Sequence, residues 1–357
     1  MKILFITRKY PPSVGGMQLF ARDLYAALGD KADTRLVKWG GSNKALPLVL
    51  PYLGLRAVWE LIRGGIDVIH VQDGLLAPLG YVLAKLSGKP LGIVIHGLDI
   101  TYDNRLYRLI VPWAVRRTDV VFCISQAAAN AARQRGVAGS KIHVIPLAVA
   151  DELHSKSSRA ELISRLQLPA ESQLLLTVGR LVKRKGVAWF IDNALPGLVK
   201  QYPDLIYLVV GEGGERHNIE TAIKRSGVAQ NVRLLGRIKD SLYEAAYNGA
   251  DVFVMPNINV PGDIEGFGLV LLEASTCALP VVAADTEGIR DAVVDGKNGV
   301  LVPSGDAAAF QHEIGRFLAD PAGAKQFGAE SRDFTLATYQ WDKIADRYIE
   351  QYQRLLH

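Results

Sequence analysis

Short, uniformly apolar runs recur along the whole chain, and stretches with helical periodicity separate them. The runs of the first half are 2–7, 34–39, 67–73, 91–97, 119–125 and 142–147. Those of the second half are 173–181, 206–213, 232–238, 251–257, 279–285 and 299–306. Because consecutive positions are apolar, rather than alternate ones, the runs are typical of strands buried on both faces of a parallel sheet. This alternation of strand and helix predicts an α/β protein with two Rossmann-like, doubly wound domains.

A polar segment, 150–173, interrupts this pattern and carries a Ser/Lys cluster. We therefore expect a first domain at 1–165 and a second at 166–337. The tail, 338–357, has helical periodicity, and in two-lobed folds of this type such a helix often crosses back to the first domain. Two domains that face each other would form a cleft at the carboxyl ends of their strands, where open α/β sheets bind ligands.

One segment, 45–62, departs from the alternation. Its residues are almost all apolar, but they include Pro47, Pro51, Arg56 and Glu60, so the segment is too short and too interrupted to span a membrane. Two interpretations stay open. The segment is either an apolar loop with a core helix of the first domain, or a surface that docks into the lipid interface.

The composition of the 357 residues is that of a globular protein, with 49% hydrophobic residues, 22% charged residues and a net charge of +5. Residues 1–168 hold 22 Lys/Arg and 12 Asp/Glu, a net of +10, whereas residues 169–357 hold 19 and 24, a net of −5. A basic first half predicts an anionic partner. Nucleic acid is disfavoured, because the chain has no basic run of five residues and no base-reading motif.

The cysteines and the N-terminus indicate the compartment. Cys123 and Cys277 lie in apolar surroundings and do not form a C-x-x-C pair, which excludes a cysteine-built zinc site and indicates reduced thiols. The N-terminal run MKILFIT is followed by Arg8 and Lys9 and does not resemble a signal peptide. We therefore expect a cytoplasmic protein, peripheral on the inner membrane face if 45–62 meets lipid.

Several common nucleotide motifs are missing from the sequence. The turn after the first strand reads TRKYPPSVGG and the turn after 206–213 reads GEGGER, so neither is the G-x-G-x-x-G of dehydrogenases. The chain also has no P-loop and no G-x-S-x-G elbow. No two aspartates are separated by one residue, so the D-x-D pair that would hold a divalent cation against a diphosphate is absent. We predict no metal site.

The strongest candidate for a binding site is the segment 265–273, which reads EGFGLVLLE. Its glycines allow a ligand close to the backbone, and the helix that follows presents free N–H groups suited to phosphate. At a helical rise of ~1.5 Å per residue, Glu265 and Glu273 would lie about 12 Å apart. That span fits a nucleotide sugar, with one carboxylate on sugar hydroxyls and the other on ribose hydroxyls. The alternative is a helix-end carboxylate and an unrelated acid.

Three other segments follow predicted strands. The segment 179–186, GRLVKRKG, places four cations after the first strand of the second domain, which predicts an anion site because Arg and Lys bind phosphate oxygens. Gly15 and Gly16 end the loop after the first strand of the chain, where their amides can face the cleft. His96 and Asp99, in the sequence HGLD, follow a third strand.

Together these segments resemble the family-4 retaining glycosyltransferases, which have the GT-B fold. The Gly-Gly loop, H-G-x-D, G-R-x-x-x-x-K-G and E-G-F-G-x-x-x-x-E occur in the order of that family and cover nearly the whole chain. The resemblance implies a retaining, metal-independent transfer of a hexose-type sugar from a UDP- or GDP-linked donor to an acceptor hydroxyl. It also implies that no cofactor is needed.

The resemblance assigns roles to individual residues. Catalytic roles would fall to His96 near the reacting carbon, to Arg180 and Lys185 on the diphosphate, and to Glu265 on the sugar hydroxyls. Donor-binding roles would fall to Gly15, Gly16, Asp99, Arg237, Ile238, Gly266, Phe267, Gly268, Leu269, Val270 and Glu273. Within that set, Glu273 would hold the ribose, whereas Arg237 and Ile238 would hold the base through main-chain groups.

The basic first domain and the apolar segment favour a lipid-linked or phosphorylated glycan acceptor, in cell-envelope polysaccharide or glycolipid synthesis. Two alternatives stay open. A GT-B-fold nucleotide-sugar 2-epimerase binds the same diphosphate but needs no acceptor. A non-catalytic, two-lobed sugar-binding protein would not need the clustered Arg and Lys residues.

Overall fold

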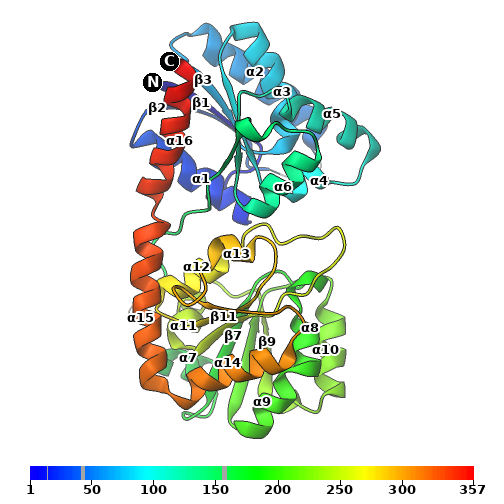
Figure 1. Ribbon diagram of the computed structural model, residues 1–357, viewed down its shortest axis with the longest axis vertical. Coiled ribbons are helices and arrows are strands. Elements are labelled where there is room, and N and C mark those ends of the chain that lie inside the picture. Colours follow the sequence, from blue (N-terminus) through cyan, green and yellow to red (C-terminus); the bar gives the residue numbers. More distant parts are fainter. Residues whose placement is uncertain (14, 42–44, 155–158) are drawn as a thin grey trace. The chain divides into compact units, whose positions relative to one another are not determined.

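The structure is a computed structural model that describes residues 1–13, 15–41, 45–154 and 159–357 (Figure 1). The described residues form two compact units. Unit 1 comprises Met1–Ala148 and Trp341–His357, and unit 2 comprises Val149–Gln340. The Ser/Lys cluster at 155–158 lies outside the described residues.

Unit 1 is built on a six-stranded sheet with the strand order β2-β1-β3-β4-β5-β6. Its strands are β1 (Lys2–Thr7), β2 (Asp33–Lys38), β3 (Val68–Val71), β4 (Leu91–Ile95), β5 (Val120–Cys123) and β6 (Ile142–Val144). Its helices are α1 (Gly16–Gly29), α2 (Leu46–Ile62), α3 (Ala77–Ser87), α4 (Leu98–Thr101), α5 (Arg105–Val115), α6 (Gln126–Gln134) and α16 (Trp341–Leu356). Helices α1 and α16 pack on one side of the sheet, and α2, α3 and α5 lie on the other (Figure 1).

Unit 2 is built on a second six-stranded sheet, with the order β12-β11-β10-β7-β8-β9. Its strands are β7 (Gln173–Val178), β8 (Leu205–Val210), β9 (Val232–Gly236), β10 (Val252–Met255), β11 (Val281–Ala284) and β12 (Val300–Val302). Its helices are α7 (Arg159–Leu166), α8 (Val187–Asn193), α9 (Leu195–Gln201), α10 (Arg216–Arg225), α11 (Asp240–Gly249), α12 (Leu269–Thr276), α13 (Ile289–Ala292), α14 (Ala307–Ala319) and α15 (Pro321–Thr338).

All strand pairs in both sheets are parallel. Strands β3, β4, β8 and β10 are buried at every position, as expected for strands covered on both faces. The predicted fold class is therefore confirmed, and each of the twelve apolar runs contains one strand or most of one.

The strand order creates a switch point in each sheet. In unit 1 the chain passes from β1 to β2 on one side and returns to β3 on the other, and in unit 2 strand β7 likewise lies between β8 and β10. At such a point the connections leave toward opposite faces and open a crevice at the carboxyl edge, where open α/β sheets bind ligands. A ligand site is therefore expected after β1 and β3, and after β7 and β10.

The first unit boundary, at 148/149, comes earlier than the 165/166 boundary that the sequence predicts. The reason is α7, which the prediction gave to the first domain. Arg159 at its start donates hydrogen bonds to the carbonyl of Gly249 (2.8 Å) and to the carboxylate of Asp251 (2.9 Å), and both partners belong to unit 2. These contacts tie α7 to the second sheet.

Helix α16 contributes to the core of unit 1, although it comes last in the sequence. The Tyr352 hydroxyl lies 2.5 Å from Nδ1 of His70 on β3, and Nε2 of His70 lies 2.6 Å from Oε1 of Gln72. Burial lowers the pKa of His70 to about 4, so the ring is neutral at pH 7 and stacks on Phe5 at 4.4 Å. These contacts fasten the last helix to the first sheet.

The apolar segment 45–62 forms one helix, α2. Val49, Leu53 and Ala57 are buried, so one face of α2 packs into unit 1, as the core-helix interpretation expects. Within the described ranges, no helix has both the length and the apolar character needed to cross a membrane.

Candidate active site

Opposite charges meet at the switch point of unit 2. The loop after β7 ends in a short turn, Lys183–Lys185, and Nζ of Lys185 lies 2.8 Å from Oε2 of Glu265. Nε of Arg184 (3.3 Å) and Nδ2 of Asn257 (3.1 Å) donate to the same oxygen. Glu265 is only 7% exposed, so these three donors surround a carboxylate that water hardly reaches.

The surrounding donors determine the charge of Glu265. Burial by itself would raise the pKa of this carboxyl group, but Lys185 and Arg184 outweigh burial and hold the pKa of Glu265 at about 2. The hydrogen bond from Asn257 acts in the same direction. Glu265 is therefore a carboxylate at neutral pH, and a carboxylate accepts hydrogen bonds from hydroxyl groups without donating any.

Close backbone contacts hold these loops in place. Gly186 has a φ of +66°, and a Cβ atom there would lie 1.8 Å from the carbonyl oxygen of Pro256 after β10. A Cβ atom on Gly288 would lie 2.3 Å from the carbonyl oxygen of Gly266. Side chains would force these segments apart, so glycine is required where the loop after β7 and the loop of Glu265 meet their neighbours.

Glu287 belongs to the same group, although sequence reasoning missed it. Its carboxylate accepts a hydrogen bond from the backbone N–H of Glu265 at 2.5 Å, and burial raises its pKa. Its φ is +36°, a conformation that residues with a side chain rarely adopt. No motif marks Glu287, because it acts on a backbone group. Asn257 was also missed, although its position after β10 was a usable signal, and Arg184 was predicted only as one of the four cations of 179–186.

Helix α12 begins at Leu269, after Gly268 with a φ of +91°. The predicted helical spacing between Glu265 and Glu273 is therefore wrong, since residues 265–268 form a loop and only the last part of that stretch is helical. The first turn of α12 still follows the loop of Glu265 directly, as the sequence predicts.

Glu273 lies on α12 and faces α11. Its Oε2 accepts hydrogen bonds from the hydroxyl groups of Tyr247 (2.9 Å) and Tyr243 (3.1 Å). Burial raises the pKa of Glu273, while the two hydroxyl groups oppose that rise. Both tyrosines were absent from the sequence-based site. Their spacing of four residues along one helix was the signal that could have found them.

The other predicted residues of unit 2 differ in exposure. The Phe267 side chain is buried and packs edge-on against Tyr339, with ring centroids 6.4 Å apart, which leaves only its backbone for a ligand. Arg180 and Arg237 are exposed and form no ion pair with the residues that the structure describes. The half-buried residues of the set are Ile238, Gly266, Leu269 and Val270.

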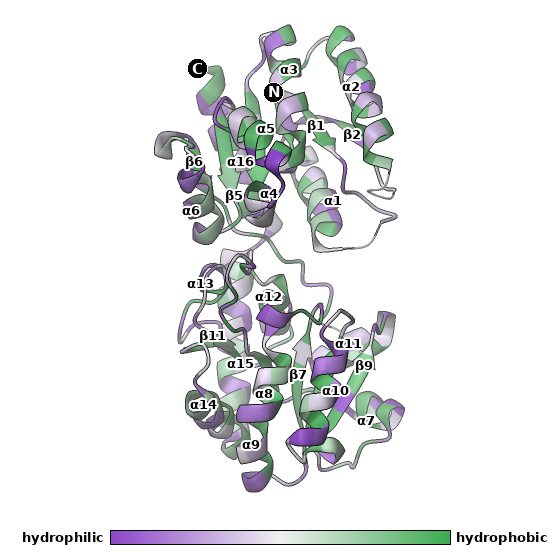
Figure 2. Ribbon diagram, turned by 90° about the vertical axis from the view of Figure 1, so that its right-hand side faces the viewer, coloured by the Kyte–Doolittle hydropathy of each residue, from purple (hydrophilic) through white to green (hydrophobic). Residues whose placement is uncertain are grey.

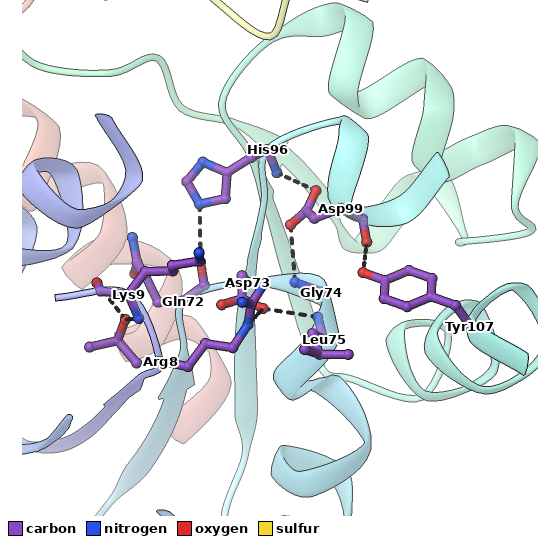
Figure 3. A network of polar contacts seen from close by, with 10 residues as sticks. Arg8, Lys9, Gln72, Asp73, Gly74, Leu75, His96, Asp99 and Tyr107 are labelled. Carbon is purple, nitrogen blue, oxygen red and sulfur yellow. Dashed lines mark hydrogen bonds and ion pairs between the residues drawn. The ribbon is translucent and has the colours of Figure 1, made fainter. Parts of the chain in front are cut away.

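A second polar group lies at the carboxyl ends of β1, β3 and β4 in unit 1 (Figure 3). Nε of Arg8 lies 3.0 Å from Oδ1 of Asp73, which is fully buried. The Asp99 carboxylate accepts hydrogen bonds from the backbone N–H groups of His96 (2.8 Å) and Gly74 (3.0 Å). Asp99 therefore joins the loops after β3 and β4 to each other.

His96 has one ring nitrogen fixed by the backbone. Its Nε2 lies 3.0 Å from the carbonyl oxygen of Gln72, which can only accept, so Nε2 carries the proton of the neutral ring (Figure 3). The Nδ1 atom then keeps the lone pair of a hydrogen-bond acceptor. The ring of Phe20 packs edge-on against the imidazole at 5.6 Å.

Gly15 and Gly16 lie at the start of α1. A Cβ atom on Gly16 would meet nothing within 4 Å, so space is open beside its backbone. Gly15 has a φ of +155°, and a Cβ atom on it would lie 2.7 Å from Oε1 of Gln18. Residue 14 of the same loop lies outside the described residues.

Among the described residues there is no cluster of metal ligands, and both cysteines are buried. The described part of the chain contains no group of three or more His, Cys, Asp or Glu side chains that could hold a metal ion. Cys123 and Cys277 are buried, and burial raises the pKa of each thiol to about 12. Both thiols are therefore protonated at neutral pH.

Comparisons with known proteins agree with this arrangement. Residues 158–334 match the family described as Glycosyl transferases group 1, and residues 14–153 match Glycosyltransferase Family 4. A D-inositol 3-phosphate glycosyltransferase of Nocardiopsis dassonvillei is 32% identical, over 80% of this chain and 70% of the relative. A GDP-mannose-dependent alpha-(1-6)-phosphatidylinositol monomannoside mannosyltransferase of Mycolicibacterium smegmatis is 29% identical, over 98% and 97%.

The fold is also shared with solved structures. Anabaena HepE in complex with UDP aligns with a TM-score of 0.80 and 21% identity, over 99% of this chain and 100% of that chain. Two parallel sheets of this topology define a GT-B glycosyltransferase fold. The chain belongs to glycosyltransferase family 4. The predicted family, fold and class, a glycosyltransferase with a nucleotide-sugar donor, are confirmed.

Proposed function

We propose that the protein transfers a hexose-type sugar from a UDP- or GDP-linked donor to a hydroxyl group of a lipid-linked or phosphorylated acceptor. In this proposal the anomeric configuration is retained, and neither a metal ion nor a cofactor takes part. The observation that carries the proposal is the buried pairing of Lys185 with Glu265 at the switch point of unit 2. A cation for the diphosphate and a carboxylate for sugar hydroxyls are the two groups that a nucleotide sugar requires.

Lys185 and Arg180 would bind the diphosphate. As the bond from the anomeric carbon to the diphosphate oxygen breaks, negative charge develops on the leaving group, and fixed cations stabilise it. In the free protein Glu265 holds Lys185 in position at 2.8 Å. Lys185 would also bind the oxygens of a bound diphosphate, which would weaken its ion pair with Glu265. The Glu265 carboxylate could then accept hydrogen bonds from sugar hydroxyls. Arg180 is exposed and is thus available to the same phosphates.

Other residues of unit 2 would bind the rest of the donor. Backbone N–H groups of the stretch 266–270 would bind phosphate and sugar oxygens, since the start of a helix offers unpaired donors. Glu273 would accept hydrogen bonds from the ribose hydroxyls, oriented by Tyr243 and Tyr247. The main chain at Arg237 and Ile238 would contact the base.

In unit 1, Gly15 and Gly16 would approach the diphosphate and His96 would contact the transferred sugar. The acceptor-capable Nδ1 of His96 supports a hydrogen bond from a sugar hydroxyl. No step needs a protein nucleophile. The new bond from the anomeric carbon to the acceptor oxygen forms on the face that the diphosphate leaves, and the departing phosphate takes the acceptor proton.

The proposal also includes the class of the acceptor and the cellular location of the protein. Relatives whose names refer to phosphatidylinositol mannosides and to inositol phosphate support a glycolipid or phosphorylated acceptor. The name of one of them also favours GDP-mannose among the candidate donors. We place the protein in the cytoplasm, in peripheral contact with the inner membrane face.

The direct test is a transfer assay with UDP- and GDP-sugars, preceded by a thermal-shift screen for the donor, since a bound ligand raises apparent stability. We expect release of the nucleoside diphosphate that depends on the acceptor, and a product whose anomeric configuration matches that of the donor. Nucleotide-sugar epimerisation without acceptor would support the epimerase instead. Donor binding without turnover would support the binding protein.

A further inference from the structure

Large apolar side chains are exposed much more on unit 1 than on unit 2. Among the described residues, 11 such side chains lie on three helices of unit 1, namely α2, α3 and α5. Over the described part of unit 2, Val294 is the one large apolar residue that is exposed. The two units have the same architecture, so the fold by itself does not require this exposure.

Helix α2 carries the most regular part of this surface. Leu48, Tyr52, Leu55, Trp59 and Ile62 are exposed and recur at intervals of four and three residues, which places them in one stripe along the helix. Leu48, Leu55 and Ile62 are exposed at 77%, 74% and 78%. The opposite side of α2 is the one that packs into unit 1. A helix that is apolar on both sides is expected to be covered on both.

The stripe continues on the neighbouring helices. Helix α3 packs against both α2 and α5, and it exposes Val82 and Leu86. On α5 the exposed residues include Leu109 and Trp113, and the Trp113 ring lies 5.1 Å from that of Tyr81 on α3. Figure 2 shows apolar residues along all three helices. We call the exposed apolar side chains of α2, α3 and α5 the apolar face.

Cations border the apolar face. The guanidinium groups of Arg56 and Arg63 lie 5.5 and 4.5 Å from the ring centre of Trp59, and that of Arg117 lies 4.3 Å from Trp113. The one acidic residue of α2, Glu60, is buried, and its carboxylate pairs with Arg35 (3.2 Å) and with Arg63 (3.5 Å). The outer side of α2 therefore combines aliphatic, aromatic and cationic groups, and the only carboxylate of this helix is buried.

The combination of apolar and cationic groups indicates which of two partners covers the apolar face, a second copy of the chain or a lipid bilayer. A second copy of the chain, paired through the same face about a twofold axis, would bring the bordering arginines of both copies together, which like-charge repulsion opposes. An anionic bilayer instead offers hydrocarbon for the leucines, an interface for tryptophan rings and phosphates for arginines. The charge of the border thus matches a lipid surface.

We propose that the apolar face docks unit 1 onto a bilayer that contains anionic phospholipid. In this position Leu48, Leu55 and Ile62 enter the acyl region, while Arg56 and Arg63 contact lipid phosphates. A hollow of about 430 Å³ between the ends of α2 and α3 adjoins the stripe at Ile62, and its lining includes Leu86 as well as Asp67 and Lys89. The inference deepens the proposed function and rests on it, because a lipid acceptor has to be met at a membrane.

The test is flotation of the full chain with vesicles of phosphatidylcholine alone or mixed with phosphatidylglycerol. We expect binding to the mixed vesicles that weakens as salt rises, because part of it is electrostatic. The double variant Leu55→Glu/Ile62→Glu should lower the bound fraction on the order of tenfold, since charge enters the lipid-facing stripe. Val294→Glu is the matched control on unit 2 and should bind vesicles like the wild type.

Flotation needs no catalysis, so its failure is distinguishable from failure of the proposed function. Donor binding, measured by thermal shift, should be equal in the wild type and the double variant, which also shows that the variant is folded. The inference would be overturned if the wild-type chain did not bind the mixed vesicles, or if the double variant bound them as well as the wild type. A dimer in solution that the double variant abolishes would also overturn it, because the face would then belong to a second copy.

Discussion

Unit 1 and unit 2 both place charged loops at the switch point of a parallel sheet, but the charges are balanced differently. In unit 2, Lys185 and Arg184 surround one carboxylate, Glu265. In unit 1, the Asp99 carboxylate accepts hydrogen bonds from backbone N–H groups, and Arg8 pairs with the buried Asp73. The group in unit 2 has cations that a ligand can share, whereas the acids of unit 1 mainly hold loops together.

The two units also differ in the apolar character of their outer surfaces. Unit 1 carries the apolar face with its arginine border, and the described part of unit 2 has nothing similar. In our proposals, one architecture therefore serves as a donor site in unit 2 and as a lipid-facing surface in unit 1. The difference lies in loops and exposed helix positions, which the fold leaves free to vary.

The largest effect should come from the cation of the unit 2 site. Lys185→Ala should lower kcat/KM about 100- to 1,000-fold, the cost of removing one group that stabilises developing negative charge. Lys183, two residues earlier in the same turn, is exposed and forms no ion pair with any described residue, so Lys183→Ala is the matched control. Steady-state kinetics would contradict the assignment if both variants lost activity equally.

Because the site loops pack closely, a side chain added at Gly186 should lower the stability of the fold. Gly186→Ala forces a Cβ atom to within 1.8 Å of Pro256 and also strains a positive φ, whereas Gly227→Ala at a φ of +72° meets nothing within 4 Å. We expect Gly227→Ala to cost about 1 kcal/mol, the price of the strain alone, and Gly186→Ala clearly more. Chemical denaturation of both variants measures the difference. Equal losses would mean that the loops are not in contact.

The pKa values predict opposite pH behaviour for the two units. The pKa of Glu265 falls from 4.5 to about 2, so its ionisation stabilises the fold above pH 4.5, and this contribution disappears as the pH falls toward 2. It amounts to about 3 kcal/mol at neutral pH. Burial raises the pKa of Asp99, so that group instead stabilises the fold at low pH and loses its contribution as the pH rises.

The stability difference between the wild type and Glu265→Gln should therefore narrow as the pH falls from 4.5 toward 2. For Asp99→Asn the difference should not narrow in that range. Unfolding with denaturant at several pH values measures both. A constant difference for Glu265→Gln would show that its carboxylate is not held by cations.

The smallest effect on the stability of the fold should come from Glu287→Gly. The change relieves a positive φ but removes the hydrogen bond to the backbone of Glu265, so the two contributions nearly cancel and stability should stay within about 1 kcal/mol. The KM for the donor should rise, because the loop of Glu265 loses a support. Glu287→Gln, whose amide oxygen can still accept that hydrogen bond, should keep a KM near that of the wild type. A donor KM that does not change in Glu287→Gly would exclude this role.

Sequence patterns predict the fold well because burial determines them. A strand covered on both faces needs an uninterrupted apolar run, so the run 91–97 contains β4 and the run 206–213 contains all of β8 except Leu205. The boundary at 165/166 was misplaced because α7 is tied to unit 2 by a side chain, Arg159, whose partners lie far away in the sequence.

The candidate site was only partly predictable. Motifs pointed to Lys185 and Glu265, but not to their contact, because a distance between two loops depends on backbone packing. Glu287 and Tyr247 were missed since they act on a backbone N–H and on another side chain. The part of the apolar face on α2 was visible in the sequence as the stretch 45–62, but the parts on α3 and α5 were not, and the exposed side of α2 follows only from the packing of unit 1.

In the proposed function, unit 2 binds the donor through the diphosphate at Lys185. Titration calorimetry of UDP and GDP into the wild type, Lys185→Ala and Lys183→Ala tests it most directly. We expect the nucleotide that binds the wild type to bind Lys183→Ala with a similar Kd and Lys185→Ala at least about tenfold more weakly. An unchanged Kd in Lys185→Ala would contradict it.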